Sequence, residues 1–286
     1  MSLSTHPLSR RALMGGLLGV GAAAVVPLGA AAAAPVIKGR IKETYLAAGG
    51  AKAFGKPLAN EVKVAIDSHN TYGQRFAHGR VWWGSGVGLV DLPGSRRVRL
   101  ASAPNFRPVL GVRDVWRTDD LDGCSALEER VVRDLDIRTM IAMNTGSDPS
   151  ITGVQRLTYS ISNAGSQLEF YRGYVSRPAS RASVGEVLAA VAASSHPVLI
   201  HCQGGKDRTG WLSDLLQRLG GVRQAQRDAD YLATKAYSGG AVDLAWLQAA
   251  RNQLLTDYGS IDAYLTKGCG LSAQTVAAVR ARVTPR

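Results

Sequence analysis

The chain has 286 residues but only three cysteines and five histidines. So few cysteines argue against the disulfide framework of a small secreted domain. The cysteines and histidines are not clustered at the spacing of metal ligands, so we predict no metal site and no cofactor. A Walker A loop, which binds nucleotide phosphates, is also missing, because Lys206 is followed by Asp207 instead of Ser or Thr.

Acidic residues are scarce relative to basic ones. The 34 lysines and arginines outnumber the 22 acids and set the formal net charge at +12. A basic surface favours anionic partners such as phospholipid headgroups, wall polymers or phosphorylated ligands. Basic residues are not interleaved with aromatic ones as in nucleic-acid-binding motifs, so no nucleic-acid partner is expected. The length and the hydrophobic content of 45% suit one or two globular domains.

The first 34 residues differ from the rest of the chain and predict an export signal. The segment SRRALMG at residues 9–15 resembles a twin-arginine signal, and an uncharged run rich in Gly and Ala follows it. Ala30–Ala34 supplies small residues of the kind found at signal cleavage sites. The alternative is a retained membrane helix over residues 12–34, which glycines and Pro27 disfavour. We therefore expect a protein that is secreted or associated with the cell envelope.

The segment PVLIHCQGGKDRTG, at residues 197–210, predicts a buried strand, a turn and the start of a helix. Val198–Ile200 is a short apolar run of the kind found in buried strands. From Thr209 on, apolar residues recur at helical spacing until two glycines end the pattern. Cys202 is therefore expected at the end of a strand, and Arg208 in the first turn of a helix.

The turn between them has the composition of an anion-binding loop. Gly204 and Gly205 permit φ > 0, so that successive backbone N–H groups, including that of Gln203, can point inward. The N-terminus of the following helix adds a partial positive charge. Arg208 can clamp two phosphate oxygens, and Lys206 can hold a second phosphate or an acidic headgroup. A dianionic phosphate therefore fits this turn.

The same environment acts on Cys202. Inward N–H groups, a helix N-terminus and the cations Lys206 and Arg208 favour the thiolate over the thiol. A thiolate below a bound phosphorus atom is a nucleophile in line for attack. Thr209 can donate its hydroxyl to the sulfur and stabilise it as a leaving group. His201 is expected to orient the loop through hydrogen bonds rather than to attack.

Spacing alone does not identify the nucleophile. Cys124 and Arg130 are separated by the same number of residues as Cys202 and Arg208. The segment between them contains no glycine, follows a helical pattern and carries two carboxylates that would repel phosphate. Cys124 is therefore expected to be structural. It could pair with Cys269, but two idle buried thiols are the preferred hypothesis.

The motif His-Cys-x-x-Gly-Lys-Asp-Arg-Thr-Gly at residues 201–210 resembles the phosphate loop of the atypical bacterial tyrosine/lipid phosphatases, a branch of the cysteine-dependent phosphatases. Residues 103–107 and 115–121 are similar to two early strand segments of this family, and residues 228–235 to one of its helices. The resemblance implies a phosphatase domain over residues 96–286 that hydrolyses phosphotyrosine or phosphoinositides. Arg117 would then line the site, although a surface salt bridge is an equal alternative.

Helical and strand patterns alternate along this domain. We expect helices at residues 125–135, 183–194, 242–258 and 272–282, and strands at 136–143 and 154–161. Such alternation favours a parallel sheet with helices on both faces. The expected fold class is therefore α/β, with a tyrosine-phosphatase-like sheet flanked by helices and a small module in front.

One segment departs from the family. Where the resemblance implies Asp-Leu-Arg, this chain has Ala142–Met143–Asn144. The leaving oxygen of a phosphate ester must still be protonated. Asp207 is our first hypothesis for the proton donor, and Asp148 is the second. Asp207 could instead form a structural ion pair with Lys206 or with an arginine of the loop.

Residues 35–95 have the texture of a separate module, rich in Gly, Trp and Tyr. A short helix near residues 41–46 and strands at Val62–Val64 and Arg80–Trp83 are expected. The module resembles one copy of the LGFP repeat, which implies attachment to a cell-envelope polymer. The alternative is that its aromatic residues Phe76, Trp82 and Trp83 simply form a small core. A linker is expected at residues 93–95.

Three functions are compatible with the sequence. The first is an exported phosphomonoester hydrolase that acts through a cysteinyl-phosphate on phosphotyrosine, in a phosphorylated protein, or on a phosphoinositide. The second is an envelope-binding protein whose phosphatase-like domain captures phosphorylated ligands without efficient turnover. The third is an inositol-polyphosphate phosphatase, which the basic charge permits.

Overall fold

The computed structural model of the protein describes residues 33–65, 70–84, 87–91, 100–146 and 148–285. The predicted export signal up to residue 32 and the predicted linker at residues 93–95 lie outside these ranges. Among the described residues, no helix has both the length and the hydropathy that a membrane span requires.

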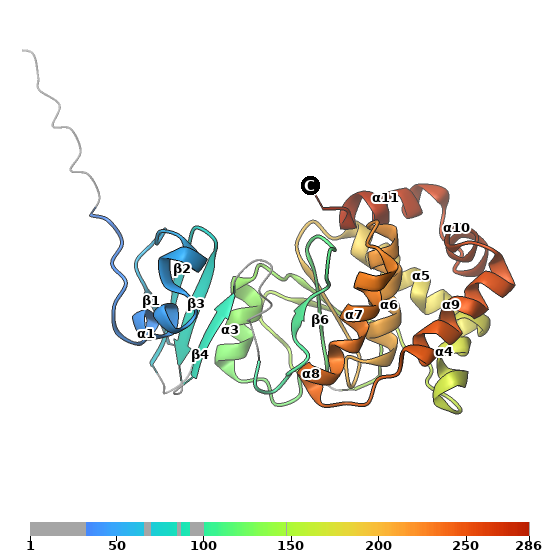
Figure 1. The fold of residues 1–286 in the computed structure, drawn as a ribbon, viewed down its shortest axis with the longest axis horizontal. Coiled ribbons are helices and arrows are strands. Elements are labelled where there is room, and N and C mark those ends of the chain that lie inside the picture. The colour runs from blue at the N-terminus through green and yellow to red at the C-terminus, as the bar shows by residue number, and fades with distance from the viewer. Residues whose placement is uncertain (1–32, 66–69, 85–86, 92–99, 147, 286) are drawn as a thin grey trace, which may run out of the picture. The chain divides into compact units, whose positions relative to one another are not determined.

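A small antiparallel sheet forms the N-terminal part of the described chain (Figure 1). Its four strands are β1 (Val62–Ala65), β2 (Asn70–Phe76), β3 (Gly79–Gly84) and β4 (Val87–Asp91), in that spatial order. The helices α1 (Gly39–Ala47) and α2 (Gly50–Phe54) precede it. The predicted short helix and both predicted strands are therefore confirmed.

Aromatic residues form the core of this part, as one of the sequence hypotheses predicts. The rings of Tyr45 and Phe76 stack with centroids 4.9 Å apart, and Phe54 packs against both. Trp83 is partly buried against the same cluster. Trp82 is the exception, because it packs with apolar residues of α3 (Ala126–Asp134) and donates its indole N–H to Asp134 across 2.9 Å.

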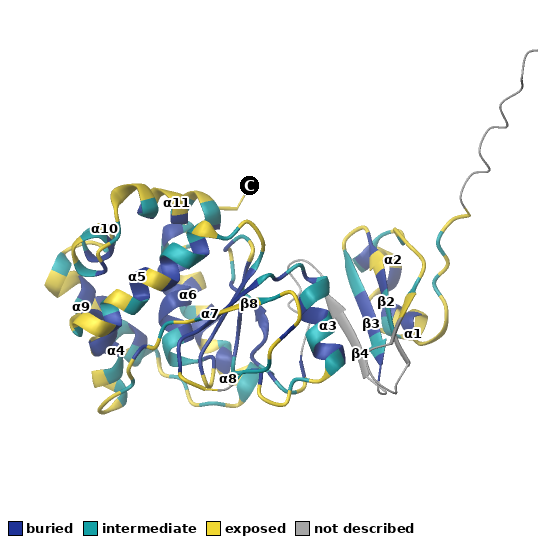
Figure 2. Cartoon of the chain, turned by 180° about the vertical axis from the view of Figure 1, so that it is seen from behind, coloured by how far each residue is buried: buried dark blue, intermediate teal, exposed yellow. Residues whose placement is uncertain are grey.

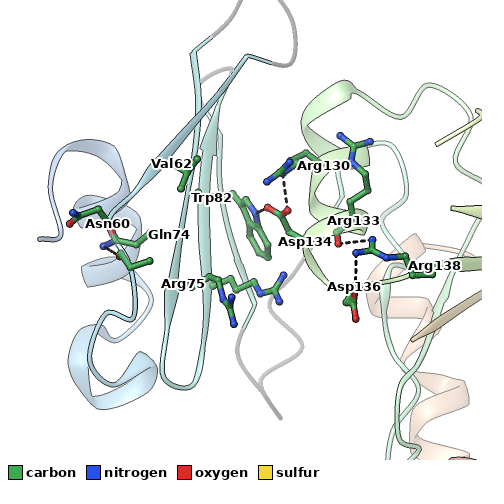
Figure 3. Close-up of a pocket in the computed structure, with 13 residues that line it drawn as sticks. Asn60, Val62, Gln74, Arg75, Trp82, Arg130, Arg133, Asp134, Asp136 and Arg138 are labelled. Carbon is green, nitrogen blue, oxygen red and sulfur yellow. Dashed lines mark hydrogen bonds and ion pairs between the residues drawn. The ribbon is translucent and has the colours of Figure 1, made fainter. Parts of the chain in front are cut away.

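A pocket of about 510 Å³ opens beside Trp82 (Figure 3). Five arginines are part of its lining: Arg75, Arg80, Arg130, Arg133 and Arg138. Arg130 forms an ion pair with Asp134, Arg133 with Glu129, and Arg138 with Asp136. Carboxylates therefore offset much of the positive charge, and none of the residues predicted to bind phosphate lines this pocket.

The larger sheet has five strands in the order β5-β6-β9-β7-β8. These strands are β5 (Arg107–Pro108), β6 (Val115–Thr118), β7 (Thr139–Ala142), β8 (Gln155–Thr158) and β9 (Val198–His201). Strands β6, β9, β7 and β8 run parallel to one another, whereas the short β5 pairs antiparallel with β6. The predicted parallel sheet is confirmed, and the strand that precedes Cys202 lies at its centre.

Residue alternation along the strands explains why helices cover both faces of this sheet (Figure 2). Leu199 of β9 and Met140 of β7 point into a cluster with α3, whereas Val198, Ile200 and Ile141 belong to a second, larger cluster. All residues of β7 and β9 are buried. Near-continuous apolar runs of this kind are typical of strands buried on both faces.

The larger cluster is covered by helices from the second half of the chain. They are α4 (Gln167–Ser176), α5 (Pro178–Ala193), α6 (Asp207–Leu219), α7 (Gln224–Leu232), α8 (Thr234–Ser238), α9 (Leu244–Tyr258), α10 (Ile261–Ala263), the π-helical turn η1 (Tyr264–Gly268) and α11 (Ala273–Val283). The predicted helices are confirmed with shifted ends: α5 begins five residues earlier than expected because Pro178 occupies its first turn. Helix α4 was not predicted.

Helix α3 begins as the sequence predicts. The Ser125 side chain accepts the N–H of Glu128, and the Glu128 side chain accepts the N–H of Ser125. This capping box satisfies two donors that the helix itself leaves unpaired. Cys124 therefore lies just before a helix N-terminus that is already occupied by a carboxylate.

Candidate active site

The predicted strand, turn and helix are present around Cys202. Strand β9 ends at His201, and α6 begins at Asp207, so Arg208 lies in its first turn. The Cys202 side chain is buried, and the Thr209 hydroxyl donates to its sulfur across 3.1 Å. The hydroxyl therefore lies where it can stabilise a thiolate.

Of the two glycines that permit φ > 0 in the turn, only Gly205 has a left-handed backbone. Gly205 has φ of 58°, and a Cβ atom there would lie 2.3 Å from the Thr118 carbonyl oxygen and 2.5 Å from the Asp119 nitrogen. At Gly204 an added Cβ would meet nothing within 4 Å. Gly205 is therefore required by both backbone angle and packing, whereas Gly204 is not.

The carbonyls of the turn are held from one side. The Asn105 amide donates to the carbonyls of Gly204 and Gly205 at 3.2 and 2.9 Å, and Arg117 donates to Gly205 at 2.7 Å. Within a planar peptide the N–H points away from the carbonyl. These three bonds therefore direct the N–H groups of Gly205 and Lys206 to the opposite side of the loop, as an anion-binding loop requires.

Arg117 lies behind the loop and is fully buried, which corrects both sequence hypotheses for it. It neither lines the mouth of the site nor forms a surface salt bridge. Its guanidinium lies 3.5 Å from Asp230, which is also within 3.8 Å of Arg107. Burial lowers the pKa of Arg117, while Asp230 and, next, Cys202 oppose this effect.

Arg208 is anchored by the backbone. One of its terminal nitrogens donates to the carbonyls of Met143 and Ile161, at 3.2 and 3.3 Å. Its Nε is buried and has no hydrogen-bond partner among the described residues. A half-buried guanidinium with a spare donor next to the turn is suited to bind phosphate oxygens.

His201 is buried beside a carboxylate. Its Nε2 lies 3.5 Å from Asp148, whose side chain is 1% exposed and forms a 3.0 Å ion pair with Arg156. Burial lowers the pKa of His201, while Asp148 acts in the opposite direction. The His201 carbonyl accepts the N–H of Met143. Neither ring nitrogen of His201 has a hydrogen-bond partner among the described residues, so its orienting role stays a prediction. Asp148 is enclosed rather than open to a substrate.

Lys206 and Asp207 contact each other, as one sequence hypothesis expected. Their charged atoms are 3.6 Å apart, and the Lys206 ammonium also lies 5.3 Å from the ring centroid of Trp246 on α9. Asp207 accepts the hydroxyl of Tyr171 at 2.9 Å, and that hydroxyl is 2.7 Å from the hydroxyl of Tyr231. Asp207 is therefore held by a cation on one side and by a phenol hydroxyl on the other.

Asp120, in the segment after β6, adjoins the phosphate loop and was not predicted as a site residue, although residues 115–121 resemble a strand segment of the family. The Asp120 N–H donates to the Gln203 carbonyl across 3.0 Å. Burial raises the pKa of Asp120, and the like charges of Asp122 and Asp148 add to this. A usable signal was present, because neighbouring parallel strands end at the same edge of a sheet and β6 is followed by two acids.

The other cysteines are not part of the site. Cys124 and Cys269 are free thiols, so the disulfide alternative is wrong. Burial raises the pKa of each to about 12, and at Cys124 the charge of Glu128 adds to it. Among the described residues, no group of three or more His, Cys, Asp or Glu side chains is placed to hold a metal ion.

Comparison with known proteins places the phosphatase domain in a family. Residues 99–285 match the model of the tyrosine phosphatase family. Similar solved structures include the PP-IP phosphatase Siw14 of S. cerevisiae (17% identity, TM-score 0.40, 59% of this chain and 94% of that chain). TpbA of P. aeruginosa is another (16%, 0.37, 58% and 91%), and a tyrosine phosphatase from the Orf virus is a third (16%, 0.32, 56% and 91%). No curated protein matches the sequence. Because the family model covers more than half of the chain, the chain belongs to the tyrosine phosphatase family.

Proposed function

We propose that the protein is an exported phosphomonoester hydrolase that acts through a cysteinyl-phosphate intermediate on phosphotyrosine or phosphoinositides. The observation that carries this proposal is the Cys202 sulfur at the end of β9, with the Thr209 hydroxyl 3.1 Å away and Arg117 buried behind the loop. A thiol in this position has a hydrogen-bond donor and a nearby cation, the two features that favour a nucleophilic thiolate.

In the first step the Cys202 thiolate attacks phosphorus, and the bond to the leaving oxygen breaks. The charge on the equatorial oxygens is stabilised by Arg208, by the inward N–H groups of the loop and by the N-terminus of α6. The leaving oxygen takes up a proton as it departs. In the second step water attacks phosphorus, and the sulfur leaves as a thiolate that accepts the Thr209 hydroxyl.

The surroundings of Lys206 support a substrate with a second anionic group. Its ammonium lies at the edge of the loop, between Asp207 and the face of Trp246, and its side chain is 20% exposed. A cation in this position can reach a second phosphate or a headgroup beyond the scissile phosphate. This feature, with the net charge of +12, also favours the alternative of an inositol-polyphosphate phosphatase.

The decisive experiment measures hydrolysis of an aryl phosphate by the wild-type protein and by Cys202→Ser. With enzyme and substrate at comparable concentrations, we expect the wild type to release a burst of phenol. For the variant we expect no hydrolysis, while binding of phosphate or vanadate is retained. Wild-type protein that binds phosphate without a burst would support the ligand-capture alternative. A panel of phosphotyrosyl peptide, phosphoinositide and inositol phosphates then separates the substrate classes by kcat/KM.

Export is supported by the arginine pair at residues 10 and 11. Replacement of both by lysine in the full chain, followed by fractionation of expressing cells, tests this part of the proposal. We expect the variant to stay inside the cell and the wild type to leave the cytoplasm. Identical fractionation of the two proteins would contradict twin-arginine export.

A further inference from the structure

The reaction needs a proton donor at the mouth of the phosphate loop. A phenol or sugar oxygen is a poor leaving group as an anion, so a positioned acid contributes about 10²–10⁴-fold to such reactions. The donor must be protonated when the bond breaks and must lie on the side of the phosphate away from the sulfur. Acidic side chains near the loop can be compared on these two requirements.

Three of these acids are already engaged with donors. Asp207 accepts a phenol hydroxyl and lies beside an ammonium, and Asp148 is enclosed with Arg156. Asp119 accepts the Thr118 hydroxyl at 3.0 Å and the Asn105 N–H at 3.2 Å, which ties it to the scaffold of the loop. Burial raises the pKa of Asp119, as it does that of Asp120, but two hydrogen bonds fix the Asp119 carboxyl group in place rather than leave it free for a substrate.

Asp120 differs from them. No hydrogen bond or ion pair of its carboxyl group is present among the described residues, and the side chain is neither fully buried nor fully exposed. The charged groups that act on it are Asp122 on its own segment and Asp148 after β7, both negative. A carboxyl group with acidic neighbours and no cationic partner tends to keep its proton.

The strand order explains why Asp120 is at the site. Thr118 at the end of β6 pairs with His201 at the end of the parallel strand β9. Asp120 lies two residues after Thr118, and Gln203 lies two residues after His201. The 3.0 Å hydrogen bond joins the backbones of these two segments. On the other side of β9, strand β7 is followed by Met143 and Asn144, and neither has an acidic side chain.

We propose that Asp120 is the catalytic acid and base of the reaction. This inference rests on the proposed function. As the Cys202 sulfur bonds to phosphorus and the ester P–O bond breaks, the leaving oxygen takes the proton of the Asp120 carboxyl group and departs as an alcohol or phenol. Water then attacks phosphorus and gives its proton to the Asp120 carboxylate, while the P–S bond breaks and phosphate leaves. Both steps balance without a further reactant.

The test compares Asp120→Asn with the wild type on p-nitrophenyl and phenyl phosphate. p-Nitrophenolate leaves without a proton, whereas phenolate is a poor leaving group. We expect kcat/KM of Asp120→Asn on phenyl phosphate to fall about 10²-fold or more. The fall on p-nitrophenyl phosphate should be smaller by a factor of at least ten. Asp120→Glu restores part of the phenyl phosphate activity, because it returns a carboxyl group to the position.

Matched controls separate this role from a general effect of charge. Glu186→Gln removes an exposed carboxylate of α5 and leaves both rates unchanged. Equal losses of Asp120→Asn on the two substrates, or a leaving-group dependence confined to Asp119→Asn or Asp207→Asn, would overturn the assignment to Asp120. If wild-type protein shows no burst on either substrate, the proposed function itself fails, and this inference falls with it.

Discussion

The buried guanidinium of Arg117 donates to the carbonyl of Gly205 across 2.7 Å while it lies 3.5 Å from Asp230. These three residues come from β6, the phosphate loop and α7. The ion pair therefore connects the helical layer to the one glycine of the loop that has a left-handed backbone. The shape of the phosphate loop depends on residues far from it in the sequence.

Replacement of Arg117 by Met is expected to damage both stability and activity. The change removes a cation that pairs with the buried Asp230, and removing one partner of a buried pair costs about 3–5 kcal/mol. Urea unfolding measures this loss. The control is Arg133→Met, whose partly exposed pair with Glu129 contributes no more than about 1 kcal/mol. Similar losses in the two variants would contradict the role given to Arg117.

Alanine at Gly205 is expected to destabilise the loop, whereas alanine at Gly204 is not. At Gly205 a side chain must adopt φ near 58° and would overlap the backbone of Thr118 and Asp119. Backbone strain of this kind costs about 1–3 kcal/mol before the overlap is included. Thermal or urea unfolding of both variants checks the difference. Equal stability would show that the loop can relax at Gly205.

Asp207→Asn is expected to lower kcat/KM by the same factor on p-nitrophenyl and phenyl phosphate. The reason is that Asp207 accepts from Tyr171 and pairs with Lys206, so its loss disturbs the loop rather than proton transfer. Tyr171→Phe removes the same contact from the other side. The double variant should lose little more activity than Asp207→Asn alone, because Tyr171→Phe removes only a contact that the change at Asp207 has already disturbed. A larger loss on phenyl phosphate would restore Asp207 as the acid.

Cys202 is expected to be the thiol that alkylates first at neutral pH. Burial raises the pKa of Cys124 and Cys269 to about 12, so both stay protonated and unreactive until the pH approaches that value. Mass spectrometry after brief treatment with iodoacetamide at pH 7 identifies the modified residue. Phosphate should slow the reaction, because it occupies the loop above the sulfur. Labelling of Cys124 at the rate of Cys202 would contradict the contrast between the two Cys-x5-Arg segments.

The local sequence was sufficient to predict the part of the site that lies within one short segment. Cys202, the turn and Arg208 lie within seven residues, and the change from strand to helix period identifies the turn between them. The same reasoning separated this segment from the one at Cys124. The capping box of α3 was equally predictable, because a cap is made by residues that are three positions apart.

Arg117 could not be placed from sequence, since a buried arginine and a surface arginine look alike there. Its position depends on Asp230, more than a hundred residues later in the chain. Helix α4 was missed, and with it Tyr171, which contacts Asp207 from another layer. Side chains that meet across layers leave no pattern in either segment alone.

The sequence by itself determined the family, and it predicts Cys202 as the nucleophile and the turn after it as an anion-binding loop, because a run of neighbouring residues carries that chemistry. Only the tertiary structure decided what surrounds the turn. The order of parallel strands brings Asp120 to Gln203 and encloses Asp148 with His201. Such contacts follow from which strands are neighbours in the sheet, and strand order is a property of the whole fold rather than of any one segment.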